Sequence, residues 1–309
     1  MANYITVDGG TTNTRISLVK DLEIKDTIKF NVGAKAGIDN KNLLRETLRD
    51  GIRGLLERND TKEREICRIL ASGMITSEFG LCKLDHIVAP AGIKELNESM
   101  EEVVFEDISD IPFVFIRGIK MLGDDFAETD MMRGEETEFA GLSSGKGGVY
   151  ILPGSHSKVI FADESGRITS FHTMLTGEMM AALSQNTILK DAVDLSASEL
   201  SEEYLLKGYN YCRECGINKA LFKVRILKNI FGKDADETYS FFVGTILCGE
   251  IEEIVKLKPE RIVIGGKKQI KKAMYCILKN ASDAEVVCID DKDVDNCVSL
   301  GAIRIFENK

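Results

Sequence analysis

The sequence predicts an α/β protein with two lobes that share one plan. A set of short strands joined by polar turns occupies residues 4–30, and a second set occupies residues 149–174. In each set the first turn is rich in glycine and hydroxyl side chains, at residues 9–14 and again at residues 153–157. Segments with helical periodicity follow both sets. A structural repeat of this kind indicates two related lobes rather than one uniform domain.

The composition is that of a soluble globular protein. The 309 residues are enough for two domains, and 44% of them are hydrophobic. The net charge of −10, from 40 basic and 50 acidic residues, argues against a nucleic-acid partner. No apolar run approaches the ~20 residues that cross a membrane, and the chain enters a strand without a signal-peptide pattern. We therefore expect a cytoplasmic protein with no membrane contact.

The segment at residues 143–148, rich in glycine and serine, is the best linker candidate. It sets the expected domain boundary, with an N-terminal lobe at 1–145 and a C-terminal lobe at 146–309. The first lobe would contain the polar turn at residues 9–14, and the second would contain the polar turn at residues 153–157, with the last helix packing back on the first lobe.

The first turn follows a buried strand at residues 4–8 and precedes strands at 15–19 and 24–30. Its glycines let the backbone approach a ligand closely, and its N–H, hydroxyl and amide groups suit phosphate oxygens. Asp8, at the strand end, is placed to hold Mg²⁺ directly or through water. A plain hairpin is the alternative, and neither standard nucleotide-binding motif is present. The residues of this predicted phosphate turn are Gly9, Gly10, Thr11, Thr12 and Asn13.

Leucines and isoleucines with a 3.6-residue period predict a helix over residues 39–57, with Asp39 or Asn40 as the N-cap. A strand at residues 66–71 then leads into a glycine-bearing loop at 72–80. Loops beyond the carboxyl end of a strand are usual ligand positions in α/β sheets. A loop is expected at residues 87–92, and another strand at 113–116.

The stretch at residues 132–137, Met-Arg-Gly-Glu-Glu-Thr, precedes a helix that we expect to open at Glu138. Adjacent carboxylates at such a junction are favoured by the helix dipole and by free N–H groups. The more specific hypothesis is that Glu135 or Glu136 acts as a general base. The sequence does not separate the two glutamates.

The second lobe is predicted to begin with strands at residues 149–152, 158–163 and 168–174. A strand at 261–264 ends in Gly265-Gly266, where a flat ring can lie against the backbone. Ser196 or Ser198 is expected to cap a helix that starts near residue 197. The other elements expected in this lobe are helices at 179–186, 216–231, 236–256, 269–279 and 295–306 and a strand at 285–289.

Cys212 and Cys215 form a C-x-x-C pair without the second pair that a structural zinc site usually needs. The remaining cysteines lie mostly in apolar surroundings. We therefore expect reduced, mostly buried thiols and no metal at this pair.

In order along the chain, the motifs at residues 8–13, 152–158 and 264–266 resemble those of the actin-like ATPase and sugar-kinase superfamily. That resemblance implies two duplicated ribonuclease-H-like lobes with a central ATP cleft. Within the superfamily, residues 132–137 and 152–158 together resemble the 2-dehydro-3-deoxygalactonokinase family. Further segments that fit the family are residues 72–75, 80, 88–90 and 174–178, and the resemblance extends from residue 4 to residue 306.

The resemblance implies ATP-dependent phosphorylation of 2-dehydro-3-deoxy-D-galactonate, or its gluconate epimer, at the 6-hydroxyl. ATP and Mg²⁺ are the expected cofactors and a small-molecule sugar acid the expected partner, and a homodimer is left open. The implied catalytic residues are Glu135, Glu136 and Asp8, with Asp8 also the metal ligand. The implied cofactor-binding residues are Gly9, Gly10, Thr11, Thr12, Asn13, Gly154, Ser155, His156, Lys158, Gly265 and Gly266. The implied substrate-binding residues are Arg133, Arg15, Gly73, Met74 and Ser77.

Two other readings of the sequence remain open. A phosphohydrolase of the same superfamily, acting on polyphosphate or a guanosine polyphosphate, would use water in place of the sugar. A non-enzymatic ATP-dependent switch or activator of a partner protein would be a different class, in which Cys212 and Cys215 could hold a cluster. Stimulation of ATP consumption by a sugar acid would distinguish the kinase from both.

Overall fold

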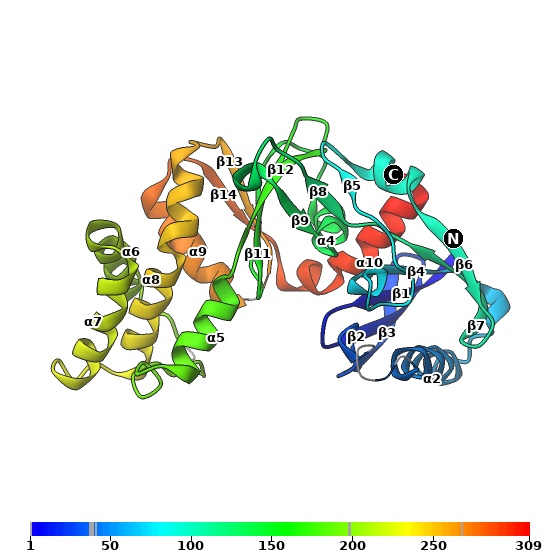
Figure 1. Ribbon diagram of the computed structural model, residues 1–309, viewed down its shortest axis with the longest axis horizontal. Coiled ribbons are helices and arrows are strands. Elements are labelled where there is room, and N and C mark those ends of the chain that lie inside the picture. Colours follow the sequence, from blue (N-terminus) through cyan, green and yellow to red (C-terminus); the bar gives the residue numbers. More distant parts are fainter. Residues whose placement is uncertain (1, 37–39, 41, 197–198, 267) are drawn as a thin grey trace. The chain divides into compact units, whose positions relative to one another are not determined.

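The fold is described from a computed structural model, which covers residues 2–36, 40, 42–196, 199–266 and 268–309. The chain forms two compact units (Figure 1). Unit 1 comprises Met1–Lys146, Asp163–Ser170 and Asp295–Lys309, and unit 2 comprises Gly147–Ala162 and Phe171–Val294. Within the described residues, no helix combines the length and apolarity needed to cross a membrane.

The main sheet of unit 1 has the strand order β3-β2-β1-β4-β7-β6. The first three strands form an antiparallel meander, as the sequence predicted, while β4 runs parallel to β1 and β7 runs parallel to β4. The carboxyl ends of β1, β4 and β7 therefore lie along one edge of the sheet. The strands are β1 (Asn3–Gly9), β2 (Thr14–Lys20), β3 (Glu23–Phe30), β4 (Ile66–Gly73), β6 (Glu101–Phe105) and β7 (Ser109–Phe115).

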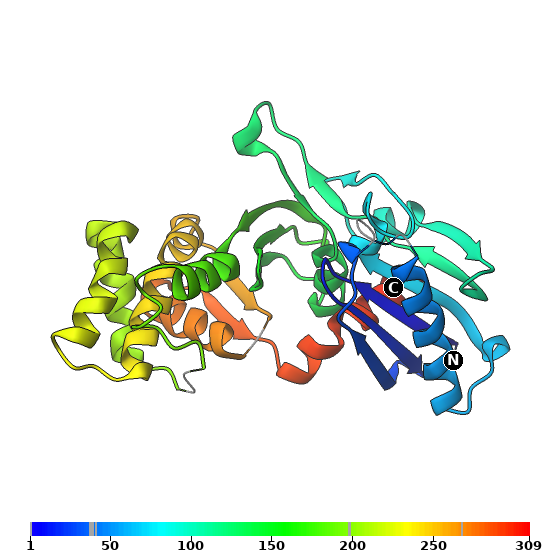
Figure 2. The same ribbon diagram turned by 60° about the horizontal axis from the view of Figure 1, so that its bottom comes forward.

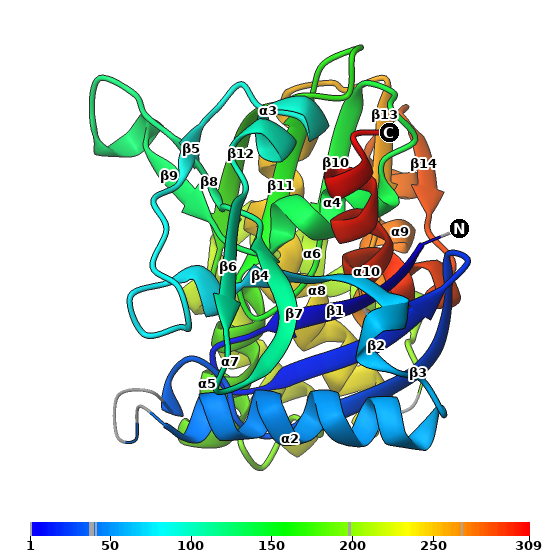
Figure 3. The same cartoon turned by 90° about the vertical axis from the view of Figure 1, so that its right-hand side faces the viewer.

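The two faces of β1 are covered by different helices because successive side chains of a strand point in opposite directions. Ile5 and Val7 pack in the apolar cluster that includes the buried face of α2 (Leu43–Arg58). Thr6 points the other way, and its hydroxyl lies 2.7 Å from that of Ser299 in α10 (Asp291–Glu307). Figure 3 shows α2 and α10 on opposite sides of the strand. Asp8 has the same parity as Thr6 and so belongs to the α10 side.

Helix α2 starts at Leu43 with Asn42 as its N-cap, so the prediction of Asn40 as the cap is wrong, and Asp39 lies outside the described residues. The segment expected as a loop at residues 87–92 contains β5 (Ile87–Val88). β5 joins a separate sheet of order β5-β8-β9, whose β8–β9 hairpin extends away from the main sheet (Figure 2). The remaining elements of unit 1 are η1 (Glu63–Glu65), η2 (Met74–Thr76), α3 (Ile93–Glu98), β8 (Ile119–Met121), η3 (Phe126–Glu128), β9 (Asp130–Met132) and α4 (Glu135–Leu142).

The sheet of unit 2 has the order β12-β11-β10-β13-β14 and repeats the arrangement of unit 1. β10 is antiparallel to β11 and parallel to β13, which is parallel to β14. The first residues of β12 belong to unit 1. The elements are β10 (Gly148–Leu152), β11 (Ser157–Ala162), β12 (Ile168–Met174), β13 (Arg261–Ile264), β14 (Glu285–Cys288), α5 (Thr176–Asn186), α6 (Glu202–Cys215), α7 (Ile217–Asn229), α8 (Ala235–Lys256) and α9 (Lys268–Ala281).

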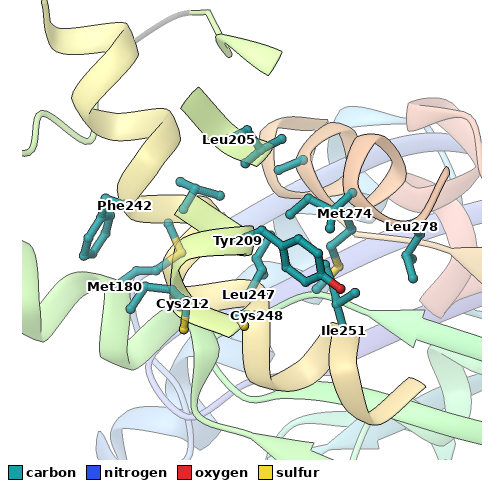
Figure 4. Packing of buried hydrophobic residues seen from close by; sticks show 14 of the residues in the cluster. Met180, Leu205, Tyr209, Cys212, Phe242, Leu247, Cys248, Ile251, Met274 and Leu278 are labelled. Carbon is teal, nitrogen blue, oxygen red and sulfur yellow. The ribbon is translucent and has the colours of Figure 1, made fainter. Parts of the chain in front are cut away.

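The core of unit 2 lies between these helices and the sheet. Figure 4 shows Tyr209 of α6 packed among Leu247 and Ile251 of α8 and Met274 of α9. Helix α6 begins at Glu202, because the Ser201 side chain accepts the N–H of Tyr204 as an N-cap. The prediction of Ser196 as the N-cap of this helix is therefore wrong, and Ser198 lies outside the described residues.

Gly141 of α4 and Gly301 of α10 let these two helices cross closely in unit 1. A Cβ added to Gly301 of α10 would lie 2.0 Å from the carbonyl oxygen of Thr137 in α4. Gly54 of α2 is the opposite case, since a Cβ there would have no neighbour within 4 Å.

We expect Gly301→Ala to lower the free energy of unfolding by about 1–3 kcal/mol, because the helices must separate to admit the methyl group. Gly54→Ala is the matched control, and it should stabilise the protein by about 0.5–1 kcal/mol through helix propensity. Urea unfolding followed by circular dichroism measures both. Equal effects of the two substitutions would contradict the close crossing.

Candidate functional site

Three glycine-bearing segments meet at the carboxyl edge of the unit 1 sheet. Gly9 at the end of β1 and Gly73 at the end of β4 are register partners. A Cβ on Gly73 would lie 2.5 Å from the carbonyl oxygen of Gly9, and a Cβ on Gly134 would lie 3.3 Å from the Cα of Gly73. Gly73 and Gly134 also have φ angles of 83° and 114°, which side-chain-bearing residues rarely adopt. The turn after β1, the loop after β4 and the start of α4 are therefore packed backbone to backbone.

The turn after β1 presents Thr11, Thr12 and Asn13 to solvent. The Gly10 N–H closes the turn by donating to the Asn13 carbonyl oxygen at 2.8 Å, and the Ala34 N–H donates to the Gly10 carbonyl oxygen at 3.0 Å. These main-chain hydrogen bonds fix the backbone of the turn, while its hydroxyl and amide side chains are exposed to solvent. This is the arrangement expected of a turn that holds phosphate oxygens.

Asp8 lies immediately before this turn, with Arg15 as its cross-strand partner. Burial raises the pKa of the Asp8 carboxyl above its usual value, Arg15 opposes the rise, and Glu135 adds to it. Asp8, Arg15 and Glu135 are therefore close enough to interact electrostatically. A desolvated carboxylate beside a second carboxylate favours a bound cation.

Helix α4 begins at Glu135, three residues earlier than expected, with Gly134 as its N-cap. Both glutamates thus lie in its first turn, but their surroundings differ. The Glu136 side chain is 0% exposed, and its two oxygens accept the Gly134 N–H at 3.0 and 2.8 Å. The Thr137 hydroxyl donates to it at 3.1 Å. Burial, followed by the charge of Glu135, raises the pKa of Glu136 to about 8.

Glu135 is half-buried, in contrast to its neighbour. Its Oε2 accepts the backbone N–H of Arg133 at 3.0 Å, which fixes the carboxylate at the helix start. The sequence could not separate these two residues, whereas the structure encloses one and leaves the other partly accessible on the side of Asp8. Only a carboxylate with access can take a proton from a bound hydroxyl.

The guanidinium of Arg133 holds the loop that follows β4. It donates to the carbonyl oxygens of Thr76 at 2.8 Å and Leu84 at 3.0 Å, and to Nδ1 of His86 at 3.2 Å. Because arginine only donates, His86 must accept through Nδ1 and is neutral. Burial and then Arg133 lower the pKa of His86 to about 4, which agrees with this tautomer. These contacts join segments some fifty residues apart and have no local signature in the sequence. Substrate binding by Arg133 stays a prediction.

The remaining predicted substrate residues belong to this loop. Met74 opens the short helix η2 directly after Gly73, and the buried hydroxyl of Ser77 donates to the Met74 carbonyl oxygen at 2.7 Å. The loop is therefore a folded element at the sheet edge, and both Gly73 and Ile75 pack against Gly9 of the predicted phosphate turn.

In unit 2 the turn between β10 and β11 exposes Gly154, Ser155 and His156. The N-terminus of α5 supports it, since the N–H groups of Gly177 and Glu178 donate to the carbonyl oxygens of Gly154 and Ser155, each at 3.2 Å. Glu178 Oε1 also lies 2.9 Å from Nε2 of His156. Glu178 is not among the predicted site residues, although it lies in the segment at residues 174–178 that fits the family.

Gly265 and Gly266 lie beside the same turn. The Gly265 N–H donates to the Ile151 carbonyl oxygen at 2.9 Å, and a Cβ on Gly266 would lie 2.6 Å from Cδ of Pro153. Lys158 is 3% exposed, and its ammonium group is 3.5 Å from the His156 carbonyl oxygen. All of the cofactor-binding residues predicted in the second lobe are therefore grouped at one end of the unit 2 sheet.

The cysteine pair lies elsewhere, on α6. Cys212 is buried, and burial raises its pKa as well as that of Cys248, which reaches about 12. Such thiols are poor ligands and poor nucleophiles. Over the described ranges, no group of three or more His, Cys, Asp or Glu residues is arranged to hold a metal ion.

Comparison with known proteins identifies the family. A family model described as 2-keto-3-deoxy-galactonokinase matches residues 8–305. A curated relative from Rhizobium meliloti (strain 1021), named as a probable 2-dehydro-3-deoxygalactonokinase, DgoK1, is 28% identical over 192 residues. That alignment spans 59% of this chain and 60% of the relative, which is less than two thirds of the relative's length.

Solved structures agree in fold. A Sinorhizobium meliloti protein provisionally named as a 2-dehydro-3-deoxygalactonokinase matches with a TM-score of 0.79 at 20% identity, covering 99% of this chain and 98% of its own. Component A of the (R)-2-hydroxyglutaryl-CoA dehydratase of Acidaminococcus fermentans matches with a TM-score of 0.52 at 14% identity, covering 100% of this chain and 99% of its own. These likenesses confirm the predicted fold class. The family match confirms the resemblance seen in the motifs, and the chain belongs to the 2-keto-3-deoxy-galactonokinase family.

Proposed function

We propose that this protein is an ATP-dependent kinase that phosphorylates the 6-hydroxyl of 2-dehydro-3-deoxy-D-galactonate, with the gluconate epimer as the alternative substrate. The observation that carries the proposal is the partly accessible carboxylate of Glu135 beside Asp8 and an outward-facing phosphate turn. Phosphoryl transfer requires this combination of positioning, charge neutralisation and a base. The family and the names of the relatives supply the sugar acid as acceptor.

The Asp8 carboxylate fits a magnesium ion, because burial and Glu135 both disfavour its charge and a cation would relieve that cost. Bound Mg²⁺ would neutralise the charge of the ATP phosphates. The exposed turns suit the phosphates themselves, and the Gly265-Gly266 backbone suits the adenosine. The residues proposed to hold ATP are Gly9, Gly10, Thr11, Thr12, Asn13, Gly154, Ser155, His156, Lys158, Gly265 and Gly266.

Glu135 is proposed as the general base. It is the half-buried member of the acidic pair, and its hydrogen bond from the Arg133 N–H leaves the carboxylate fixed in direction. Glu136 is fully enclosed and folds back on Gly134 and Thr137. Its role is to shape the start of α4 and to influence Glu135 electrostatically. The partial exposure of Glu135 and the burial of Glu136 support the choice of Glu135 as the base.

The sugar acid carries a carboxylate, and Arg15 is the proposed partner for it because Arg15 lies on β2 directly across from Asp8 of β1. Gly73, Met74 and Ser77 are proposed to line the sugar. Arg133 would act on the same subsite mainly through the loop that it anchors at Thr76 and Leu84.

The proposed activity is tested by ATP consumption with 2-dehydro-3-deoxygalactonate, with the gluconate epimer, and with no acceptor. ADP release that depends on a sugar acid, with a 6-phosphate product, is the expected result. Loss of polyphosphate without ATP would instead support the phosphohydrolase. Sugar-independent ATP hydrolysis that neither epimer stimulates would contradict the kinase proposal.

We expect Glu135→Gln to lower kcat by about 10²–10⁴-fold while ATP still binds, because the amide cannot accept the hydroxyl proton. Glu136→Gln preserves a neutral group of the same shape and should change kcat by less than about tenfold. Steady-state kinetics and calorimetric ATP titration measure both. Glu102→Gln, an exposed residue on β6, is the matched control. A larger loss of kcat in Glu136→Gln than in Glu135→Gln would instead assign the general-base role to Glu136.

The raised pKa of Glu136 predicts that the free energy of unfolding depends on pH. Its folded-state pKa of about 8 lies above the usual 4.5, so the folded protein binds this proton more tightly than the unfolded chain does. The stabilising contribution is complete below pH 4.5 and is lost as the pH rises through 8. Urea titrations at several pH values should show a flatter stability profile for Glu136→Gln than for the wild type across this window. Parallel profiles would show that the carboxyl is not buried as described.

Arg133→Lys should loosen the loop after β4, because an ammonium group cannot reproduce the forked contacts to Thr76, Leu84 and His86. We expect faster amide exchange across residues 76–84 and a higher KM for the sugar acid, with little change in the KM for ATP. Arg45→Lys, which alters a surface pair with Asp107, is the control. An unchanged exchange rate would contradict the anchoring role.

A further inference from the structure

We infer that Glu250 of α8 is a positioning residue for the turn between β10 and β11, and that it acts through Thr176 at the start of α5. This role rests on the proposed function, in which that turn holds the phosphates of ATP. Helix α5 packs against α8 within unit 2 (Figure 1). The buried hydroxyl of Thr176 donates to Oε2 of Glu250 at 2.7 Å, and this bond joins residues 74 positions apart in the chain.

The N-terminus of α5 is capped by the turn itself. Leu175 occupies the N-cap position, and its side chain accepts no N–H group of the first helical turn. The carbonyl oxygens of Gly154 and Ser155 accept the N–H groups of Gly177 and Glu178 instead. The helix start and the turn are therefore fixed to each other, so a contact that holds the helix start also holds the turn.

The contact between helix and turn leaves little room for adjustment. A Cβ on Gly177 would lie 2.5 Å from the carbonyl oxygen of Gly154 and 2.8 Å from the Cα of Ser155. The side chain of Glu178 also reaches the turn, with 2.9 Å between its Oε1 and Nε2 of His156. A displacement of the first residues of α5 would therefore move the backbone of the turn and the imidazole together.

Glu250 occupies an apolar part of α8. Among the described residues, the buried glutamates are Glu136, at the candidate site of unit 1, and Glu250, which is 3% exposed. The buried residues near Glu250 along the helix include Leu247, Ile251 and Ile254. Burying a carboxylate is costly unless hydrogen bonds replace its hydration, so the hydrogen bond from α5 is important for this side chain.

That hydrogen bond engages one oxygen of the carboxyl group. No described residue donates to Oε1 of Glu250, which is also buried. Burial raises the pKa of Glu250 to about 7, the Thr176 hydroxyl opposes the rise, and Glu253 adds to it. A buried carboxyl with one satisfied oxygen is a poor source of stability. Its bond to Thr176 is better explained by the position that it gives to the start of α5.

Calorimetric titration of the full chain with ATP and with adenosine tests this role, because adenosine has no phosphates to contact the turn. Thr176→Val removes the hydroxyl with little change in shape. We expect it to weaken ATP binding by about tenfold, to leave adenosine binding unchanged, and to speed amide exchange at Gly177 and Glu178. Thr176→Ser keeps a hydroxyl and should restore the ATP affinity and the slow exchange.

Thr187→Val is the matched control at the other end of α5. The Thr187 hydroxyl donates to the Leu183 carbonyl oxygen, away from the turn between β10 and β11. Its loss should leave the ATP affinity and the amide exchange at Gly177 and Glu178 unaltered.

A double variant, Thr176→Val combined with Glu250→Leu, separates positioning from stability. Thr176→Val alone leaves a buried carboxyl without a described donor, which lowers the free energy of unfolding, whereas the double variant replaces both polar groups by apolar ones and should be close to the wild type in stability. We expect the double variant to be folded by circular dichroism and still to bind ATP about tenfold more weakly than the wild type, with fast exchange at Gly177 and Glu178. An apolar contact fills space but does not fix a direction.

Wild-type exchange at Gly177 and Glu178 in the folded double variant would overturn the inference, because Glu250 would then be a structural residue only. Equal weakening of ATP and adenosine binding would overturn it as well, as would an unchanged affinity for ATP. If the wild type binds no ATP, the proposed function fails, and the amide exchange alone then decides whether Glu250 positions the turn.

Discussion

The candidate site of unit 1 depends on the close backbone approach of β1, β4 and α4. Parallel pairing places Gly9 opposite Gly73, and the loop after β4 then reaches the start of α4 at Gly134. A side chain at any of these contacts would separate the segments that carry Asp8, the loop after β4 and the acidic pair. The glycines therefore act as spacers that bring three distant parts of the sequence into one site.

Burial then differentiates chemical groups that are identical in the sequence. Glu135 and Glu136 are neighbours with the same side chain, but a helical step of one residue points them in different directions. Glu136 enters the interior, where loss of hydration outweighs its bonds from Gly134 and Thr137 and its pKa rises. Glu135 remains at the surface of the site near Asp8. Distinct protonation behaviour within one acidic pair is a common basis of acid–base roles in enzymes.

Much of the fold could be predicted because its signals are local. The meander strands and the helices at residues 43–58, 217–229 and 235–256 follow the expected periods closely. The start of α4 was missed since it depends on the unusual φ of Gly134, and β5 was missed because two residues give no periodicity. The motifs predicted turns at residues 9–13 and 153–156, and the structure has turns there between β1 and β2 and between β10 and β11. The contacts of Arg133 with Thr76 and Leu84, and the burial of Glu136, arise from tertiary packing and have no local signature.

The alternation along β1 has a consequence for how this chain can change in length. Ile5 and Val7 face the α2 core, while Thr6 and Asp8 face the other side. The alternation of side chains along β1 therefore positions both the core residues and the proposed metal ligand. A single-residue insertion or deletion within the strand would exchange its faces, turning the carboxylate toward apolar side chains and the isoleucine toward Ser299. A point substitution in β1 changes a side chain on one face of the strand, whereas a one-residue shift would affect both stability and chemistry.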